Sequence, residues 1–141
     1  MNSLRRLSLF LGLAWGTVFA ANVPSVSPAE AAKLVAAGTA VLVDVREPAE
    51  WAESGVALPA VLLAKSEFDA ALAGDWKPFL EKSRGKEIIL YCRSGRRSGA
   101  VAAALAAQGY RVANAGGFKD WQAAGLPVRR VPPPAGGKES H

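Results

Sequence analysis

Residues 92–98 read Cys-Arg-Ser-Gly-Arg-Arg-Ser and contain the only cysteine of the 141-residue chain. They follow an apolar run and precede a stretch of small residues, so we expect the chain to turn here from a strand into a helix. Backbone N–H groups in such a turn, together with a helix N-terminus, form a nest that binds anions. Gly95 permits the tight turn. We therefore expect the segment to favour the thiolate of Cys92, which is the nucleophilic form.

The same segment carries fixed positive charge on three arginines: Arg93, Arg96 and Arg97. This charge favours an anionic sulfur, including a persulfide, and attracts an anionic donor such as thiosulfate. The alternative is a buried cysteine beside arginines that only solvate a surface turn. The convergence of a cysteine, a glycine and three arginines in one turn favours the anion-binding interpretation.

The residue types that the chain lacks narrow the chemistry. Its only histidine is His141, in the expected C-terminal tail, so a Cys–His dyad is not expected. The sequence has no cluster of histidines and cysteines for a metal and no Gly-x-x-x-x-Gly-Lys nucleotide-binding pattern, so we expect no metal and no organic cofactor. Backbone dipoles and guanidinium charge must then activate Cys92. A net charge of +5 without a concentrated basic stripe predicts no nucleic-acid partner.

The segments around this turn alternate between strand and helix patterns. Apolar runs predict strands at 40–45, 60–63, 87–91 and 110–113. Amphipathic or small-residue patterns predict helices at 27–38, 48–53, 66–73, 76–82, 99–108 and 118–123, the first with a capping box from Ser27 and Glu30. This alternation predicts an α/β fold with a central parallel sheet flanked by helices. Sites in such folds form where a strand ends and a helix begins, as at Tyr91-Cys92.

The N-terminal residues have the three parts of a secretory signal. A short basic start precedes an apolar run over 7–19, and small residues then suit cleavage after Ala20 or Ala21. We expect a signal peptide at 1–20, the folded domain at 24–130 and a disordered tail at 131–141. The protein would be periplasmic or secreted, with no stable membrane insertion after cleavage. An uncleaved anchor is the alternative, although the run is shorter than the roughly 20 residues that a span needs.

Residues 44–51 (DVREPAEW), 91–98 (YCRSGRRS) and 109–121 (GYRVANAGGFKDW) form three blocks. Together they resemble the rhodanese (thiosulfate sulfurtransferase) family in its single-domain form, over about residues 27–128. The resemblance implies a rhodanese-like three-layer domain. It also implies that Cys92 attacks the outer sulfur of a donor such as thiosulfate and becomes a persulfide. The sulfur then passes to cyanide or to a thiol, which a protein acceptor can supply.

The resemblance also implies roles for individual residues. It makes the loop residues substrate-binding: Arg93, Ser94, Gly95, Arg96, Arg97 and Ser98. It makes Asp44, Arg46 and Glu50 structural or pocket-wall residues. Because charges at strand ends are usually paired, we expect these three to form ion pairs that brace the loop.

Two rival functions use the same pocket. One is a non-catalytic sulfur carrier, or a module that binds an anion or a partner. The other is a phosphatase- or arsenate-handling enzyme, whose longer loop has an arginine six positions after the cysteine. Here that position is Ser98, with Arg97 one residue earlier, so the shorter loop disfavours this rival. Residues 55–60 (GVALPA) also depart from the family's usual Gly-His-Ile-Pro-Gly-Ala, which we expect to change the scaffold locally and leave the chemistry intact.

Overall fold

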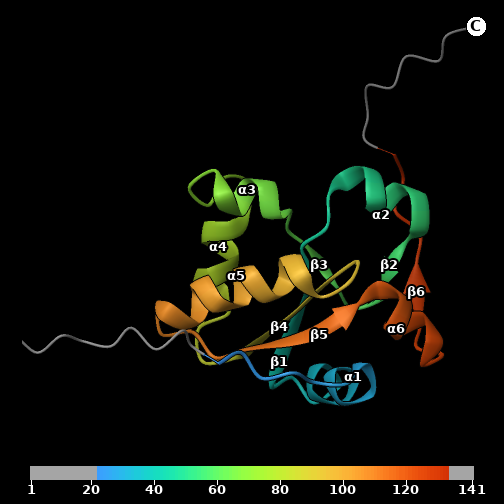
Figure 1. The fold of residues 1–141 in the computed structure, drawn as a ribbon, viewed down its shortest axis with the longest axis horizontal. Helices are drawn as coiled ribbons and strands as arrows, with labels where there is room; N and C mark the ends of the chain where they lie inside the picture. Colours follow the sequence, from blue (N-terminus) through green and yellow to red (C-terminus); the bar gives the residue numbers. More distant parts are fainter. Residues whose placement is uncertain (1–21, 134–141) are drawn as a thin grey trace, which may run out of the picture.

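The computed structural model describes residues 22–133, in which four parallel strands form the central sheet (Figure 1). The strands are β1 (Ala40–Asp44), β3 (Val61–Leu62), β4 (Glu87–Cys92) and β5 (Val112–Gly117), in the order β3-β1-β4-β5. The two central strands, β1 and β4, are almost continuous runs of buried residues, as a parallel sheet covered on both faces requires. The predicted central parallel sheet is confirmed.

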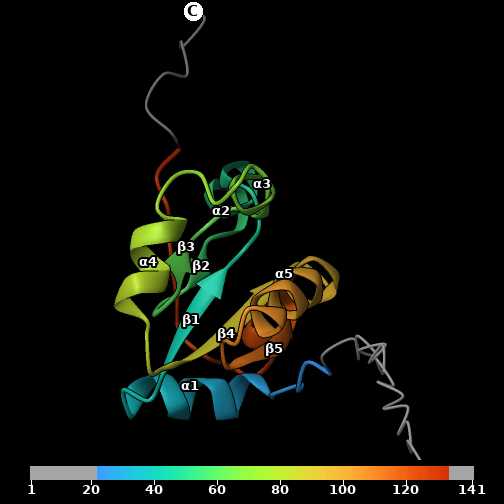
Figure 2. The same cartoon turned by 90° about the vertical axis from the view of Figure 1, so that its left-hand side faces the viewer.

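Helices cover both faces of this sheet, which makes three layers (Figure 2). One face packs against α3 (Lys65–Asp69), α4 (Trp76–Lys82) and α5 (Arg96–Ala107), and the other against α1 (Pro28–Ala36) and α6 (Phe118–Ala123). The side chains of β4 alternate between the faces. Ile88, Leu90 and Cys92 pack on the α5 side. Ile89 and Tyr91 pack on the α1 side. The predicted α/β fold is confirmed, and it points the Cys92 side chain toward α5.

Several element boundaries differ from the sequence-based prediction. Helix α5 begins at Arg96 and not at residue 99, because Gly95 adopts a left-handed conformation that turns the chain directly into the helix. Strand β5 extends to Gly117, beyond the predicted end at 113, because its small residues give no apolar periodicity. Helix α3 ends at Asp69, before the predicted end at 73. The loop residues thus include the first turn of α5.

A second, two-stranded sheet was not predicted. Strand β2 (Val56–Ala57) pairs antiparallel with β6 (Val128–Arg129), which follows α6. Strands of two residues are too short to give a periodic pattern, so the sequence could not indicate them. The pairing ties the end of the domain to the atypical segment 55–60. Helix α2 (Pro48–Ser54) leads into that segment.

The N-terminal part of the domain lies against β5. Ser27 Oγ accepts a hydrogen bond of 3.1 Å from the N–H of Glu30, so Ser27 caps α1 as predicted. Of the predicted capping box, this is the half that the described residues form. The expected signal peptide, 1–20, and most of the expected tail, 131–141, lie outside the described residues. Within residues 22–133, every helix is too short or too polar to cross a membrane.

Candidate active site around Cys92

Cys92 is the last residue of β4 and is fully buried. Because α5 begins at Arg96, only residues 93–95 join the strand to the helix. Gly95 has a φ of 91°, which only glycine adopts readily, and a Cβ at this position would lie 3.2 Å from the Cα of Gly116. The short turn therefore depends on a glycine, and it holds the helix N-terminus directly beside the sulfur.

Hydrogen-bond donors surround the Sγ atom of Cys92. The N–H of Gly95 donates to it at 3.0 Å, and the hydroxyl of Ser98 lies 3.4 Å away. The backbone N–H groups of Ser94 and Ser98 also contribute hydrogen bonds. Burial raises the pKa of the Cys92 thiol, but these hydrogen bonds outweigh it, so the pKa lies below its ordinary value. The site therefore favours the thiolate.

One of the three loop arginines is bound in an ion pair, and the other two are exposed. The two terminal nitrogens of Arg97 donate to the two carboxylate oxygens of Glu50 on α2, both at 2.7 Å. This pairing holds the pKa of Glu50 at about 2. Arg93 and Arg96 have exposed side chains. The backbone part of the expectation agrees with the structure, because the larger causes that lower the pKa of Cys92 are a hydroxyl and backbone N–H groups. Guanidinium charge also acts, since the negative charge of Cys92 raises the pKa of Arg97.

A second ion pair lies at the end of β1. The Nη2 atom of Arg46 is 2.8 Å from Asp44 Oδ2, and both residues are buried. Arg46 also donates to the Ser54 hydroxyl and the Gly55 carbonyl, both at 2.8 Å, and its guanidinium lies over the Phe118 ring at 4.5 Å. Although burial lowers the pKa of Arg46, pairing with Asp44 raises it overall. Arg46 thus ties β1 to α2, to the atypical segment 55–60 and to α6.

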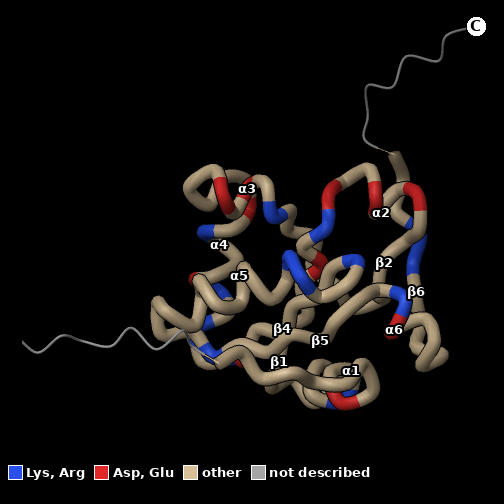
Figure 3. The backbone as a smooth tube through the Cα atoms, in the orientation of Figure 1, with Lys and Arg blue, Asp and Glu red and all other residues tan. Residues whose placement is uncertain are grey.

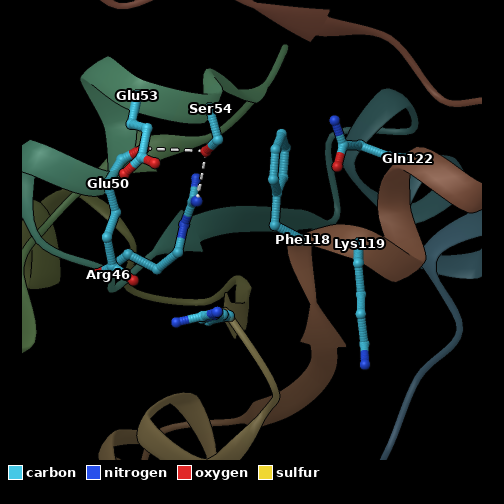
Figure 4. A pocket seen from close by; sticks show the side chains of 8 residues that line it. Arg46, Glu50, Glu53, Ser54, Phe118, Lys119 and Gln122 are labelled. Atoms are coloured by element: carbon cyan, nitrogen blue, oxygen red, sulfur yellow. Dashed lines mark hydrogen bonds between the residues drawn. The ribbon is translucent and has the colours of Figure 1, made fainter.

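A pocket of about 420 Å³ opens beside the loop (Figure 4). Arg46, Glu50, Glu53 and Ser54 lie on one side of it, and Phe118, Lys119 and Gln122 lie on the other (Figure 4). Arg93 also lines it. Cys92 is not among the lining residues, but the adjacent Arg93 is, so the pocket reaches the loop next to the sulfur. Basic residues occupy the start of α5 and the end of β6 (Figure 3). The pocket lining itself has three basic residues, Arg46, Arg93 and Lys119, and two acidic ones, Glu50 and Glu53.

The predicted site residues fall into separate groups. Cys92, Ser94, Gly95 and Ser98 gather around the sulfur, and Arg46, Glu50 and Arg93 line the pocket. Asp44 is buried beneath Arg46, Arg97 is bound to Glu50, and Arg96 is exposed on the first turn of α5. In the described part of the chain, the acidic and cysteine side chains form no group of three that could hold a metal ion.

Sequence reasoning assigned no role in the site to Asn114, Gly117 or Phe118. Gly117 passes so close to the loop that a Cβ would lie 2.4 Å from the carbonyl oxygen of Arg93. The Asn114 side chain hydrogen-bonds to the loop from β5. The glycine pair at 116–117 was a visible signal of close backbone approach. Asn114 gave no signal, because its contacts depend on the pairing of β4 with β5.

Comparisons with known proteins agree with this geometry. A sequence model of the rhodanese-like domain family matches residues 27–124. A sulfurtransferase from Allochromatium vinosum is 37% identical over 90 residues, which are 62% of this chain and 77% of the relative. The human single-domain sulfurtransferase TSTD1 is 27% identical, with a TM-score of 0.58 over 72% of this chain and 96% of that one. A rhodanese-related protein from Thermoplasma volcanium is 26% identical, with a TM-score of 0.63 over 77% and 99% of the two chains.

Proposed function

The chain belongs to the rhodanese-like sulfurtransferase family, and on that basis we propose that it transfers sulfane sulfur through a persulfide on Cys92. The donor is thiosulfate or a persulfide, and the acceptor is cyanide or a thiol. The observation that carries the proposal is the set of N–H and hydroxyl donors around Sγ, with the N–H of Gly95 at 3.0 Å. A terminal persulfide sulfur is also an anion, so fixed donors at this position suit both states.

The reaction divides into two displacements in which atoms and charge balance. The Cys92 thiolate attacks the outer sulfur of thiosulfate and forms a new S–S bond. The old S–S bond breaks, its electron pair leaves with sulfite, and Cys92 becomes a persulfide anion. In the second step cyanide attacks the outer sulfur, thiocyanate leaves, and the Cys92 thiolate is regenerated. Neither step needs a general base, which fits a chain whose only histidine is His141.

Mass spectrometry of the protein incubated with thiosulfate tests the first step. We expect a mass gain of one sulfur atom that dithiothreitol removes and that Cys92→Ser lacks. Cyanide or a thiol is then added to test the second step. Turnover above the uncatalysed rate supports the enzyme. Loading without turnover rejects the enzyme and leaves the sulfur carrier, and no loading from thiosulfate or from an organic persulfide contradicts both.

The lining of the pocket suggests where an anionic donor approaches. Arg93 is exposed, adjoins Cys92 and lines the pocket. We expect Arg93→Gln to raise the KM for thiosulfate severalfold and to change kcat less, because the charge attracts the donor before the sulfur is attacked. Arg111→Gln is the matched control, because it removes the same charge from another exposed arginine. Arg111 directly precedes Val112 at the start of β5, whereas the loop lies against the end of that strand at Gly117. An equal KM increase in both variants would attribute the effect to overall charge and not to the pocket.

The proposal includes export of the protein. The pattern over residues 1–20 is typical of a signal peptide, with a basic start, an apolar run and small residues at the expected cleavage point. The test is to express the full chain in a bacterium, fractionate the cells and weigh the protein. A periplasmic product that begins at residue 21 or 22 supports export with cleavage. A full-length product in the membrane fraction would support the anchor.

A further inference from the structure

Asn114 lies in β5, which pairs with β4 along one edge. Along its other edge, the backbone of Asn114 is hydrogen-bonded to the segment that precedes α1. Its N–H donates to the carbonyl of Pro24 at 2.8 Å, and its own carbonyl accepts from the N–H of Val26 at 3.0 Å. The segment before α1 therefore runs along the free edge of β5 and pairs with it at this residue. The Asn114 side chain is thus held from a rigid part of the sheet.

The side-chain amide of Asn114 makes three hydrogen bonds near the loop. Its Nδ2 donates to the carbonyl of Gly95 at 2.8 Å, while its Oδ1 accepts from the hydroxyl of Ser98 at 2.8 Å and from the N–H of Gly116 at 3.1 Å. A carbonyl can only accept and a backbone N–H can only donate, so these partners allow one orientation of the amide. Asn114 therefore holds the loop at two points, the end of the turn at Gly95 and the first turn of α5 at Ser98.

The two loop residues that Asn114 holds are also the ones closest to the sulfur. Gly95 donates its N–H to Cys92 Sγ at 3.0 Å, and the Ser98 hydroxyl lies 3.4 Å from the same atom. We propose that Asn114 is a positioning residue that holds the loop at Gly95 and Ser98 so that the N–H of Gly95 points at the sulfur of Cys92. The proposal deepens the proposed function and rests on it, because it matters for sulfur transfer only if Cys92 is the nucleophile. Asn114 itself makes no contact with the sulfur.

The Ser98 hydroxyl has a single proton, and two acceptors compete for it. Asn114 Oδ1 at 2.8 Å is the closer one, and Cys92 Sγ at 3.4 Å is the other. Removing the amide would let this proton turn to the sulfur, which would offset the loss of order at Gly95. The decisive comparison is therefore made in a Ser98→Ala background, where only the effect through Gly95 remains. Arg97 is the charged group that interacts with Cys92, whose negative charge raises the pKa of Arg97. Arg97 and its partner Glu50 are the same in every variant, so their effect on the pKa of Cys92 cancels in the comparison.

The experiment compares Ser98→Ala with Ser98→Ala/Asn114→Leu. The readout is the pKa of Cys92 from the ultraviolet absorbance of the thiolate, after subtraction of the Cys92→Ser spectrum. Absorbance needs no reagent to reach a buried sulfur. We expect Asn114→Leu to raise the pKa by about one unit, a tenfold loss of thiolate below the pKa. An unchanged or lowered pKa would overturn the proposal.

Val112→Ala in the same background is the matched control. Val112 is a buried residue of β5 that packs in the core, so its truncation destabilises the strand without removing a bond to the loop. We expect its Cys92 pKa to stay at the Ser98→Ala value, and a rise equal to that of Asn114→Leu would overturn the positioning role. Asn114→Ser replaces Asn114→Leu if the leucine variant does not fold, because its short neutral side chain cannot reach Gly95. The pKa is measured without a sulfur donor, so failure of the proposed function and failure of this inference are distinguishable.

Discussion

The ion pair between Glu50 and Arg97 joins α2 to the first turn of α5, and it allows a quantitative prediction of stability. Both guanidinium–carboxylate distances are 2.7 Å, and the side chains of Arg97 and Glu50 are 32% and 28% exposed. Glu50→Gln removes the carboxylate charge and keeps the shape of the side chain. We expect this substitution to lower the free energy of unfolding at neutral pH.

The magnitude follows from the pKa of Glu50, which falls from 4.5 to about 2, mainly because Arg97 binds the carboxylate. The difference of about 2.5 units corresponds to about 3.4 kcal/mol at 1.36 kcal/mol per unit. Solvent screens a pair this exposed, so we expect a loss of about 2 kcal/mol in Glu50→Gln. A depressed pKa gives stability that is fully present above pH 4.5 and disappears as the pH falls toward 2.

Urea unfolding of both proteins over this pH range is the assay. The difference in unfolding free energy should be largest at neutral pH, shrink below pH 4.5 and vanish near pH 2. Taking the difference between the two proteins cancels the other carboxylates. Asp69→Asn is the matched control, because Asp69 pairs with Lys65 on the surface with 56% of its side chain exposed. We expect a loss of no more than about 0.5 kcal/mol there. A Glu50→Gln loss that equals the Asp69→Asn loss, or that does not change with pH, would refute the reasoning.

Three further substitutions test the loop and the core. Ser98→Ala removes a hydroxyl 3.4 Å from the sulfur and keeps the backbone N–H, so it should raise the pKa of Cys92 by up to about one unit, and thiolate absorbance measures this; an unchanged pKa would exclude the hydroxyl as a cause. Gly117→Ala places a Cβ 2.4 Å from the Arg93 carbonyl and should lower the unfolding free energy by about 2 kcal/mol or more; near-native urea stability would show that the loop moves freely. Trp76→Ala empties a fully buried position and should cost about 3–5 kcal/mol, whereas a loss below about 1 kcal/mol would contradict its core role.

Sequence patterns predicted the helices and strands whose side chains are large, apolar and regularly spaced. Helix α4 was predicted with its observed bounds, and strand β4 was predicted to end one residue early. Strand β5 was misjudged because residues 113–117 are small and carry no apolar alternation. The pairing of β2 with β6 was beyond prediction, because a strand of two residues is defined by its partner and not by its own sequence.

The residues of the candidate site also divide into those that the sequence predicted and those that it missed. Residues that act within one turn, Cys92 and Gly95, were found from their order in the chain. The bond between Arg97 and Glu50 depends on how α2 and α5 pack, so the sequence predicted pairing of the strand-end charges without naming the partner. Asn114 was missed because its role depends on the neighbouring strand, and asparagine in a strand has no distinctive pattern.

The geometry of Arg97 also bears on the phosphatase-like rival. Enzymes that bind phosphate on such a loop need a guanidinium fork that faces the phosphate oxygens. Here both terminal nitrogens of Arg97 bind Glu50 at 2.7 Å, and only residues 93–95 separate β4 from α5. The donors that do face the sulfur are backbone N–H groups, that of Gly95 at 3.0 Å, and the Ser98 hydroxyl lies 3.4 Å from the same atom. Since that arrangement stabilises charge on the sulfur itself and the Arg97 fork is bound to Glu50, it favours sulfur over phosphate as the group that we propose Cys92 carries.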